Sequence, residues 1–383
     1  MKVMLAAGDP SGDVYGGALA EALRTLSPGV RLLGLGGPRM REAGVRLLYD
    51  LSALSSVGVV EALRNIPLLK RLLSRLGDVL DSQRPDVLVL IDFPGFNLKL
   101  GELAHSKGIP VVFYFSPSAW AWGKDRARQV ARIAARVCTV LPMEDEVYRE
   151  AGANVTYVGH PLLDLVRVTG DGPSLRRELG LESAEPMVAL LPGSRSQEVR
   201  HLLPVMIRAA QEVHRALPGA RFAVAVAHTF RSEELERIAR ATGVAEGDPA
   251  WPLWIEGRTY DVLAAAHVAV VASGTATLEG ALLGTPLVVV YKVAPSTYAL
   301  GKMLVKVPFL ALPNLIAGRK VVPELLQSDA SPTRIAEEVV ALWKDPEARQ
   351  AMVEAYGEIR ARLGGPGATM RAAQVVLEVG GSR

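Results

Sequence analysis

The sequence predicts an α/β protein made of two successive domains, each a doubly wound parallel sheet covered by helices. Short aliphatic runs alternate with longer segments of helical period, which is the pattern of repeated β-α-β units. The alternation lapses into turn residues near 167–173 and then restarts, so a boundary is expected between domains 1–166 and 167–345. After Ser331 only the helical period remains, which predicts a helical tail.

Six aliphatic runs in the first domain are short enough to be strands that are buried on both faces. The segments between them have the 3.6-residue period of helices. The predicted strands are Val3–Ala7, Arg31–Leu35, Val87–Ile91, Val111–Phe115, Arg136–Val140 and Asn154–Val158, and the predicted helices are Gly12–Leu26, Gly58–Leu80, Leu98–Lys107 and Lys124–Ala135.

The second domain repeats the pattern with fewer clear strands. Ligands of open α/β sheets bind beyond the carboxyl ends of the strands, so the site is expected in a cleft faced by the two sheets. The predicted strands are Met187–Leu191, Arg221–Ala227, Val268–Val271 and Leu287–Val290, and the predicted helices are Gln197–Leu217, Ser232–Ala241 and Thr275–Leu283.

Composition excludes several classes of protein. With 383 residues, 49% of them hydrophobic, the chain is neither a disordered tail nor a disulfide-stapled miniprotein. A net charge of +3 is too balanced to indicate a nucleic-acid partner. The lone Cys138 lies in an apolar run and is expected to be a buried small hydrophobe.

The mean hydropathy of +0.21 is high for a chain with only 5% aromatic residues, so its apolarity is aliphatic. Buried parallel strands explain such a composition, and contact with lipid is the other explanation. The N-terminal apolar run meets Asp9 too soon for a signal peptide, and no apolar stretch approaches the ~18–20 residues of a spanning helix. A cytoplasmic location is therefore expected.

Two loops of the second domain are typical of phosphate sites. In Leu190-Leu-Pro-Gly-Ser-Arg195 a glycine turn leads into a helix, which leaves N–H groups free for a phosphate. Ser194 lies in this turn, and Arg195 adds a bidentate donor. A capped helix with a surface arginine is the structural alternative.

The second loop is Val271-Ala-Ser-Gly-Thr-Ala-Thr-Leu-Glu279, again a strand, a turn and a helix. Ser273, Gly274 and Thr275 are expected to present N–H donors to a diphosphate. Glu279 lies one turn further on the same helix face, where a carboxylate accepts hydrogen bonds from ribose hydroxyls. Two such loops with a ribose carboxylate favour a nucleotide diphosphate, although a buried glutamate that caps its neighbours is also consistent with the pattern.

In the first domain, Asp92 directly follows the predicted strand Val87–Ile91. A carboxylate at this edge is a candidate general base, or alternatively a cap for the next turn. The loop Gly8-Asp-Pro-Ser-Gly-Asp13 follows the first strand; its Gly12 allows close backbone approach, and Ser11 or Asp13 can cap a helix. Structural and substrate-binding roles are equally consistent with this loop.

Two further segments indicate a platform for sugar or acyl groups. Trp120 and Trp122 lie in a loop that follows a predicted strand, where they either form such a platform or pack. Residues 57–76 form a basic, leucine-rich amphipathic stretch that is typical of interfacial helices, although core helices with a basic edge are more common. Pro67 is expected to break or kink it. Its apolar face includes Val59, Leu63, Leu68 and Leu72, and its basic flank includes Arg64, Lys70, Arg71 and Arg75.

Taken together, these residues resemble the lipid-A-disaccharide synthase family. The matches run in order over nearly the whole chain, and the ordered set is highly specific. One departure is Gly95, where the family often has a second acidic residue, which points to Asp92 alone as the acting group. The matching segments are Gly8–Asp13, Gly37–Met40, Ile91-Asp92, Phe96-Asn97, Ser116–Trp122, Gly159-His160, Leu191–Arg195, Ser273–Glu279 and Leu312–Gly318.

The resemblance implies an inverting glycosyltransferase of the two-Rossmann-domain (GT-B) type, with helices 346–383 returning to the first, acceptor-binding domain. The donor would be UDP-2,3-diacylglucosamine and the acceptor 2,3-diacylglucosamine 1-phosphate (lipid X), which give a β-1′,6-linked disaccharide 1-phosphate and UDP. Asp92 would be the base, Arg195 and the 273–275 loop would hold the leaving group, and Glu279 and Asn314 would complete the nucleotide site.

No metal and no cofactor are expected, because the chain has no Asp-x-Asp triplet of the kind that cation-dependent transferases usually carry. The acylated substrates favour residues 57–76 as a docking surface, so peripheral contact with the cytoplasmic face of the inner membrane is expected. Self-association into a homo-oligomer is left open.

Two rival interpretations remain. One is a related UDP-N-acetylglucosamine user, either a lipid-linked glycosyltransferase or a soluble 2-epimerase; a 2-epimerase would not need a membrane face. The other is a non-catalytic two-lobed ligand-binding protein.

Overall fold

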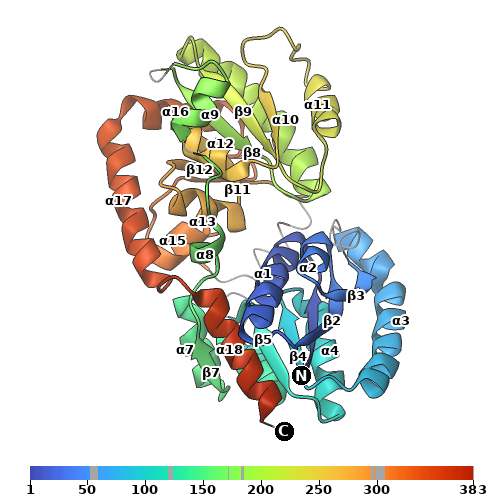
Figure 1. The fold of residues 1–383 in the computed structure, drawn as a ribbon. Coiled ribbons are helices and arrows are strands. Elements are labelled where there is room, and N and C mark those ends of the chain that lie inside the picture. The colour runs from blue at the N-terminus through green and yellow to red at the C-terminus, as the bar shows by residue number, and fades with distance from the viewer. Residues whose placement is uncertain are drawn as a thin grey trace. The chain divides into compact units, whose positions relative to one another are not determined.

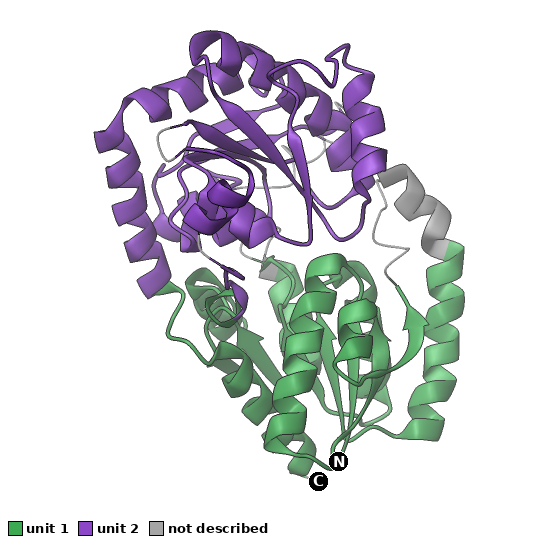
Figure 2. Ribbon diagram, turned by 45° about the horizontal axis from the view of Figure 1, so that its top comes forward, with its two compact units in different colours: residues 1–164, 304–306, 362–383 green, residues 165–303, 307–361 purple. Residues whose placement is uncertain are grey.

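The computed structural model of the protein describes residues 1–51, 59–119, 124–170, 172–182, 185–294, 298 and 307–382, with only the backbone at 59–66 and 124. The chain divides into two compact units (Figure 2). The described residues of unit 1 fall in Met1–Asp164 and Arg362–Arg383, and those of unit 2 fall in Leu165–Met303 and Val307–Ala361.

Unit 1 is built on a parallel sheet of seven strands in the order β3-β2-β1-β4-β5-β6-β7. The central strands are fully buried because helices cover both faces, which explains their continuous runs of Val, Leu and Ile. The strands are β1 (Lys2–Ala7), β2 (Arg31–Gly36), β3 (Arg46–Asp50), β4 (Val87–Ile91), β5 (Val111–Tyr114), β6 (Arg136–Thr139) and β7 (Val155–Tyr157).

The helices of unit 1 form two layers. Alternate strand residues such as Met4, Leu88 and Leu90 share one core cluster with α3, α4 and α6, while α1 packs with α18 on the opposite face (Figure 1). The helices are α1 (Pro10–Leu26), α2 (Pro38–Glu42), α3 (Val59–Gln83), α4 (Pro94–Ser106), α6 (Lys124–Ile133), α7 (Pro142–Glu150) and α18 (Ala368–Gly381).

Unit 2 has a parallel sheet of six strands in the order β10-β9-β8-β11-β12-β13. In both sheets the strand order reverses direction next to the first strand, at β1/β4 and at β8/β11. The predicted doubly wound α/β class is therefore confirmed. The strands of unit 2 are β8 (Met187–Leu191), β9 (Arg221–Val226), β10 (Leu253–Glu256), β11 (Val268–Ala272), β12 (Leu287–Tyr291) and β13 (Glu324–Leu326).

Helices cover the second sheet as well, and α10 and α16 pack along one another. The helix α8 (Leu162–Leu165) lies at the boundary between the units. The remaining helices are α9 (Gly172–Glu178), α10 (Ser196–Ala216), α11 (Ser232–Arg240), α12 (Thr259–Ala265), α13 (Thr275–Leu282), α15 (Leu312–Ala317), α16 (Pro332–Lys344) and α17 (Pro346–Arg362).

The C-terminal helices are shared between the units. Helix α18 packs on α1 and on strands β4, β5 and β6, as expected for a segment that returns to the first domain. Helix α17 lies almost wholly in unit 2, where Met352 Sδ accepts a hydrogen bond from Leu287 N at 3.4 Å. The returning segment is thus shorter than the predicted 346–383.

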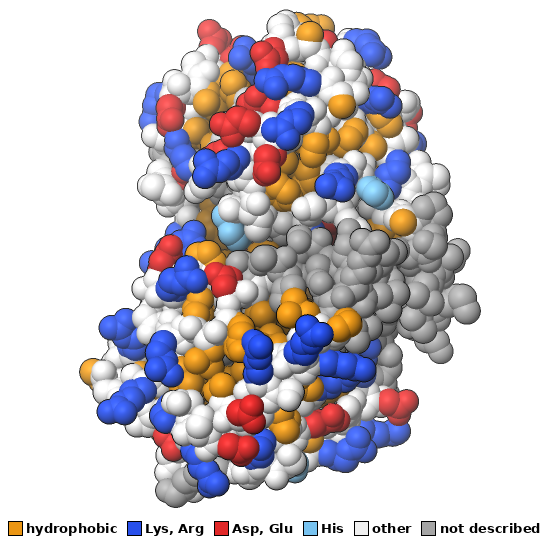
Figure 3. Space-filling view, turned by 90° about the vertical axis from the view of Figure 1, so that its right-hand side faces the viewer, with side chains coloured by type: hydrophobic (Ala, Val, Ile, Leu, Met, Phe, Trp, Pro, Cys, Tyr) orange, Lys and Arg blue, Asp and Glu red, His pale blue; other side chains and the backbone are white. Residues whose placement is uncertain are grey.

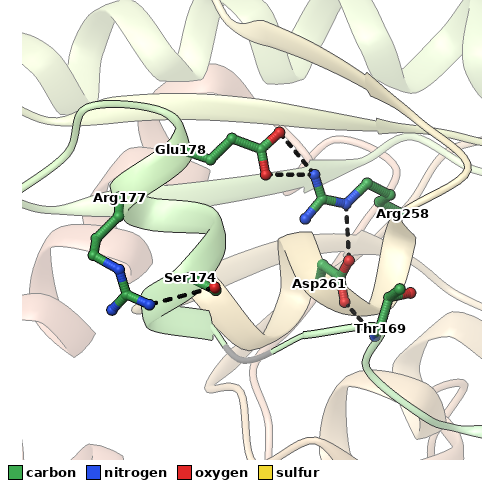
Figure 4. A network of polar contacts seen from close by, with 6 residues as sticks. All are labelled: Thr169, Ser174, Arg177, Glu178, Arg258 and Asp261. Carbon is green, nitrogen blue, oxygen red and sulfur yellow. Dashed lines mark hydrogen bonds and ion pairs between the residues drawn. The ribbon is translucent and has the colours of Figure 1, made fainter.

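The linker after α8 is tied down in unit 2 (Figure 4). The buried carboxylate of Asp261 accepts hydrogen bonds from Thr169 N at 2.7 Å and from Arg258 Nε at 2.9 Å. Arg258 also pairs with Glu178 of α9, with its Nη1 2.7 Å from Oε2. These charged contacts hold the linker against the start of α12, and they hold the pKa of Asp261 below its usual range.

Part of the lipid-facing surface predicted for helix α3 is wrong. Leu72 was expected on that surface, but it is 5% exposed and belongs to the core of unit 1. Leu68 is 49% exposed and is flanked by exposed Lys70 and Arg71. Helix α3 continues through Pro67, so the helix does not break there, and the alternative of a kink at Pro67 stays a prediction. The side chains of Val59 and Leu63 lie outside the described residues.

Leu72 and Leu68 of α3 provide a matched pair of substitutions that tests which of the two supports the core. We expect Leu72→Ala to lower the free energy of unfolding by about 2–5 kcal/mol, because it leaves a cavity in the core of unit 1. Leu68→Ala is expected to change it by less than about 0.5 kcal/mol, because solvent already reaches that side chain. Urea unfolding followed by circular dichroism measures both, and equal midpoints for the two variants would contradict the assignment.

Candidate functional site

Two loops meet at the carboxyl edge of the sheet in unit 1. The loop after β1 contains Ser11, Gly12 and Asp13 at its junction with α1, and the turn after β4 contains Asp92. Because β1 and β4 are neighbours, with Ala7 paired to Ile91, the two loops lie at the point where the strand order reverses. A Cβ at Gly8 would be 2.3 Å from the Phe93 ring, so glycine is required for this close approach.

Asp92 lies in a strained turn. Asp92 and Phe93 both have φ of +50°, a left-handed conformation that costs non-glycine residues roughly 1–2 kcal/mol each. Asn97, buried in the first turns of α4, holds the turn, because its Nδ2 donates to Ala6 O at 3.0 Å, Ile91 O at 3.2 Å and Asp92 O at 2.6 Å. Such enforced strain is concentrated at functional sites.

An aromatic cluster fixes the other side of this turn. Asp92 N donates to Phe115 O at 3.1 Å, and Phe115 is itself left-handed with φ of +59°. The Phe115 ring stacks on Tyr15 with centroids 4.0 Å apart, and His160 lies edge-on to both rings. Burial lowers the pKa of His160 to about 3, and its Nδ1 accepts a hydrogen bond from Leu162 N. A neutral imidazole is therefore part of the packing.

Asp13 has a structural role that the sequence left open. It is 5% exposed, and its oxygens accept hydrogen bonds from Gly37 N at 2.7 Å, Arg39 N at 2.9 Å and Met40 N at 3.1 Å. Asp13 thereby joins the start of α1 to the start of α2. Contact of Asp13 with substrate stays a prediction.

The start of α1 is capped by Asp9, which the sequence did not single out. Asp9 Oδ1 accepts a hydrogen bond from Gly12 N at 2.7 Å, and Ser11 Oγ donates to Asp9 Oδ2 at 3.4 Å. A Cβ at Gly12 would be 2.7 Å from that carboxylate oxygen, so the capped turn requires the glycine. Substrate contacts of Ser11 and Gly12 stay predictions.

The loop after β5 is anchored by Tyr148 of α7, whose hydroxyl donates to Pro117 O. This loop therefore begins in a fixed position beside Asp92, since β5 pairs with β4. The predicted platform residues Trp120 and Trp122 lie outside the described residues.

In unit 2 the corresponding edge holds the loops after β8 and β11. Arg195 precedes α10, and its Nη1 lies 2.8 Å from Glu198 Oε1. Glu198 Oε2 accepts from Ser194 N at 3.3 Å and from Arg195 N at 3.4 Å, so the predicted free N–H groups are capped by this carboxylate. The Arg195 side chain is 45% exposed and the Glu198 side chain 19% exposed, so this ion pair lies near the surface and contributes only about 0.2–1 kcal/mol.

The second loop lies beside it, because β8 and β11 are neighbours. Gly274 is exposed, and α13 begins at Thr275, so the N–H groups of its first turn point out of the helix toward this edge. Ser273 Oγ donates to Leu310 O at 3.2 Å. The structure thus brings the two predicted phosphate loops together.

Asn314 is buried, and its side chain has a structural role. Its part in the nucleotide site, which the resemblance implied, stays a prediction. Its Nδ2 donates to Val322 O at 3.0 Å and Glu324 Oε1 at 2.8 Å, and its Oδ1 accepts from Val321 N and Val322 N. These contacts use the full hydrogen-bonding capacity of the amide. Glu324, which the sequence did not single out, also accepts from Leu310 N at 2.9 Å and fixes the segment that Ser273 contacts.

Glu279 lies one turn into α13, as predicted. Desolvation raises the pKa of its carboxyl group to about 7, and a hydrogen bond from the Tyr260 hydroxyl to Oε1, 3.2 Å long, acts in the opposite direction. The carboxyl group is therefore poised between its charged and neutral forms near neutral pH. An ionised carboxylate is a stronger hydrogen-bond acceptor than a neutral carboxyl group.

Cys138 is buried in β6 with its pKa raised to about 12 by burial, so its thiol is unreactive, as the apolar run predicted. In the part of the chain that the structure describes, no three His, Cys, Asp or Glu side chains are grouped to hold a metal ion. No helix of the described residues is both long and apolar enough to cross a bilayer.

Comparison with known proteins identifies the family. Residues 3–379 match the family model described as Lipid-A-disaccharide synthetase. The lipid-A-disaccharide synthase of Myxococcus xanthus is 42% identical over 378 residues, which cover 99% of this chain and 97% of that protein. The chain belongs to the lipid-A-disaccharide synthetase family. The family and glycosyltransferase class predicted from the sequence are confirmed.

A second relative supports the same assignment. The lipid-A-disaccharide synthase of Syntrophus aciditrophicus is 42% identical over 375 residues, with 98% of this chain and 97% of that protein covered.

Solved structures confirm the fold. UDP-N-acetylglucosamine 2-epimerase from Neisseria meningitidis aligns with a TM-score of 0.66 at 14% identity, over 99% of this chain and 100% of that one. MurG from Acinetobacter baumannii aligns with a TM-score of 0.57 at 14% identity, over 98% and 99% of the two chains. At such low identity the likeness shows that these proteins share the fold of this chain and carries no statement about its activity.

The Asp92 turn gives a prediction about Asn97. We expect Asn97→Ala to lower the free energy of unfolding by about 1–3 kcal/mol, because three carbonyl groups lose their buried donor. Glycosyl transfer should fall as well, because the left-handed turn that carries Asp92 loses its anchor. The exposed Asn154→Ala is the control for both measurements. Activity and stability unchanged in Asn97→Ala would show that Asn97 does not hold the turn.

Proposed function

We propose that this protein transfers 2,3-diacylglucosamine from UDP-2,3-diacylglucosamine to the 6-hydroxyl of lipid X, forming the β-1′,6 disaccharide 1-phosphate and UDP. Membership of the synthetase family supports this reaction. The observation that carries the mechanism is Asp92, placed by an enforced strained turn at the switch point of the sheet in unit 1. In this proposal, domain 1–166 binds the acceptor and domain 167–345 binds the UDP-sugar.

The reaction is one in-line displacement. The acceptor 6-hydroxyl oxygen attacks the anomeric carbon of the donor, and the Asp92 carboxylate takes the hydroxyl proton. The bond between that carbon and the diphosphate oxygen breaks, and the electron pair leaves with UDP. Attack opposite the leaving group converts the α-linked donor into a β-linked product.

The departing UDP gains negative charge, which unit 2 is suited to stabilise. We assign this role to Arg195, with Ser194 beside it, and to the N–H groups of Ser273, Gly274 and Thr275 at the start of α13. Glu279 accepts hydrogen bonds from the ribose hydroxyls. Asn314 supports this site through Glu324, which accepts hydrogen bonds from Asn314 Nδ2 and from Leu310 N.

Asp92→Asn tests the base. Asparagine tolerates the left-handed conformation, and its side-chain oxygen can still accept from Phe93 N, so the fold should persist. We expect kcat to fall by about 10²–10⁴-fold, because the amide cannot take the proton. The exposed Asp81→Asn is the control. The measurement is disaccharide 1-phosphate formed from both diacyl substrates.

Two results would overturn these proposals separately. Unimpaired turnover by Asp92→Asn would remove Asp92 as the base and leave the reaction standing. No turnover of the acylated UDP-sugar by the wild-type protein would remove the reaction itself.

The surface of α3 is the proposed site of peripheral contact with the cytoplasmic face of the inner membrane. On the face of the molecule in Figure 3, Lys and Arg side chains surround hydrophobic atoms in the lower part of the view. Exposed Leu68 lies beside Lys70, Arg71 and Arg75, which combines an apolar anchor with positive charge. The acyl chains of the proposed substrates lie in the membrane, so the enzyme must contact the membrane surface to reach them.

Charge reversal tests this surface. We expect Lys70→Glu/Arg71→Glu/Arg75→Glu to weaken binding to phosphatidylglycerol-containing vesicles by about a hundredfold or more, since each basic residue contributes about 1 kcal/mol. Reversal of the exposed Arg208, Arg215 and Arg237 of unit 2 is the matched control. Co-sedimentation measures both, and an equal loss in the two triple variants would show an unspecific charge effect.

A further inference from the structure

Tyr260 contacts a residue of the proposed nucleotide site without belonging to any motif that the sequence singled out. It lies in the first turn of α12, and its hydroxyl donates to Glu279 Oε1 at 3.2 Å. The contact joins two helices, α12 and α13, that pack together in unit 2.

The backbone at Tyr260 is held by contacts on both sides. Arg258, just before α12, is fixed between Glu178 and Asp261, as Figure 4 shows. Asp261, the next residue after Tyr260, is 1% exposed and accepts from Thr169 N at 2.7 Å. At the other end of the helix, Thr285 Oγ1 donates to Leu263 O at 2.8 Å. A helix held at both ends presents the Tyr260 hydroxyl from a fixed position.

The elements that pack against α13 bring few titratable groups near Glu279. Helix α13 packs against α12, α15, β11 and β12. Strand β11 and helix α15 contain no titratable side chain, and β12 contains Tyr291, on which the charges of Glu198 and Arg195 act. Helix α12 contributes Tyr260 and Asp261, and Asp261 is engaged by Arg258 and Thr169. Tyr260 is the group that opposes the desolvation of Glu279.

We propose that Tyr260 is a positioning residue of the nucleotide site, whose hydroxyl fixes the Glu279 carboxylate so that it accepts the ribose hydroxyls of UDP. The inference rests on the proposed function, in which Glu279 binds the ribose. The bond to Oε1 sets the rotation of the carboxylate, which leaves Oε2 and the second lone pair of Oε1 for the ribose. The same bond favours the ionised form, which is the acceptor that the hydroxyls need.

The sign of the pH dependence follows from these contacts. UDP affinity of the wild-type protein should rise as the pH passes through about 7, because the Glu279 carboxyl group ionises there. Removing the Tyr260 hydroxyl removes a bond to the charged form, so the pKa of Glu279 rises and the midpoint of the affinity profile moves to higher pH. A loss of helix packing would instead weaken binding equally at every pH.

The experiment measures UDP affinity by calorimetry from pH 6 to 9.5 for wild type, Tyr260→Phe, Glu279→Gln and the double variant. For Tyr260→Phe we expect a midpoint about one pH unit higher, which makes binding about fivefold weaker at pH 7 and less than twofold weaker at pH 9. Tyr356→Phe, in the same unit, is the control for loss of a buried tyrosine hydroxyl and should keep the wild-type profile. Ionisation of UDP itself is common to all variants and cancels in their ratios.

The Glu279 variant tests the ribose contact, and the Tyr260 variant tests the positioning role. Glu279→Gln should lose the pH response near 7, and adding Tyr260→Phe to it should change nothing further. If Glu279→Gln binds UDP with the wild-type profile, the ribose contact of the proposed function fails and this inference fails with it. If Glu279→Gln loses the response but Tyr260→Phe keeps the wild-type midpoint, the role of Tyr260 alone is overturned.

Discussion

Both sheets reverse their strand order next to the first strand, and the candidate site residues depend on this constraint. Parallel strands are joined by crossover helices. In unit 1 the chain adds strands first on one side of β1 and then on the other. The loops that follow the two neighbouring strands at the reversal therefore run to opposite sides and leave a crevice between them. In unit 1 these loops follow β1 and β4, and in unit 2 they follow β8 and β11. Asp92, Arg195 and Ser273 all lie on these loops, so buried aliphatic strands fix the positions of the polar groups.

The Asp92 turn shows how the core supports an unfavourable backbone. Two consecutive left-handed residues would not persist in a loop held only by solvent. Here one buried amide, Asn97, satisfies three carbonyl groups, the absence of a side chain at Gly8 makes room for Phe93, and Phe115 accepts from the backbone of Asp92. The strain is thereby maintained by packing that extends to Tyr15 and His160.

The central strands could be predicted from the sequence because both of their faces are buried, which leaves an unbroken aliphatic run such as Val87–Ile91. The edge strands β3, β10 and β13 were missed, because half-exposed segments such as Leu253–Glu256 carry no such run. Short helices such as α2 were missed because five residues show no period. Leu68 and Leu72 look alike in the sequence, and only the direction in which α3 packs separates them.

The candidate site was predictable in position and less so in role, and its carboxylates show why. Asp13 accepts hydrogen bonds from three backbone N–H groups, which join α1 to the start of α2. Glu198 caps α10 and pairs with Arg195, whose side chain is exposed. Glu279 is desolvated with the Tyr260 hydroxyl as its donor, and Asp92 is displayed on a strained turn. Each of these side chains follows a strand or begins a helix, so the local pattern is nearly the same. Their hydrogen-bond donors come from elsewhere in the chain, such as Gly37 for Asp13 and Tyr260 for Glu279. Because those donors are not adjacent in the sequence, the role of each carboxylate depends on contacts that no local pattern reveals.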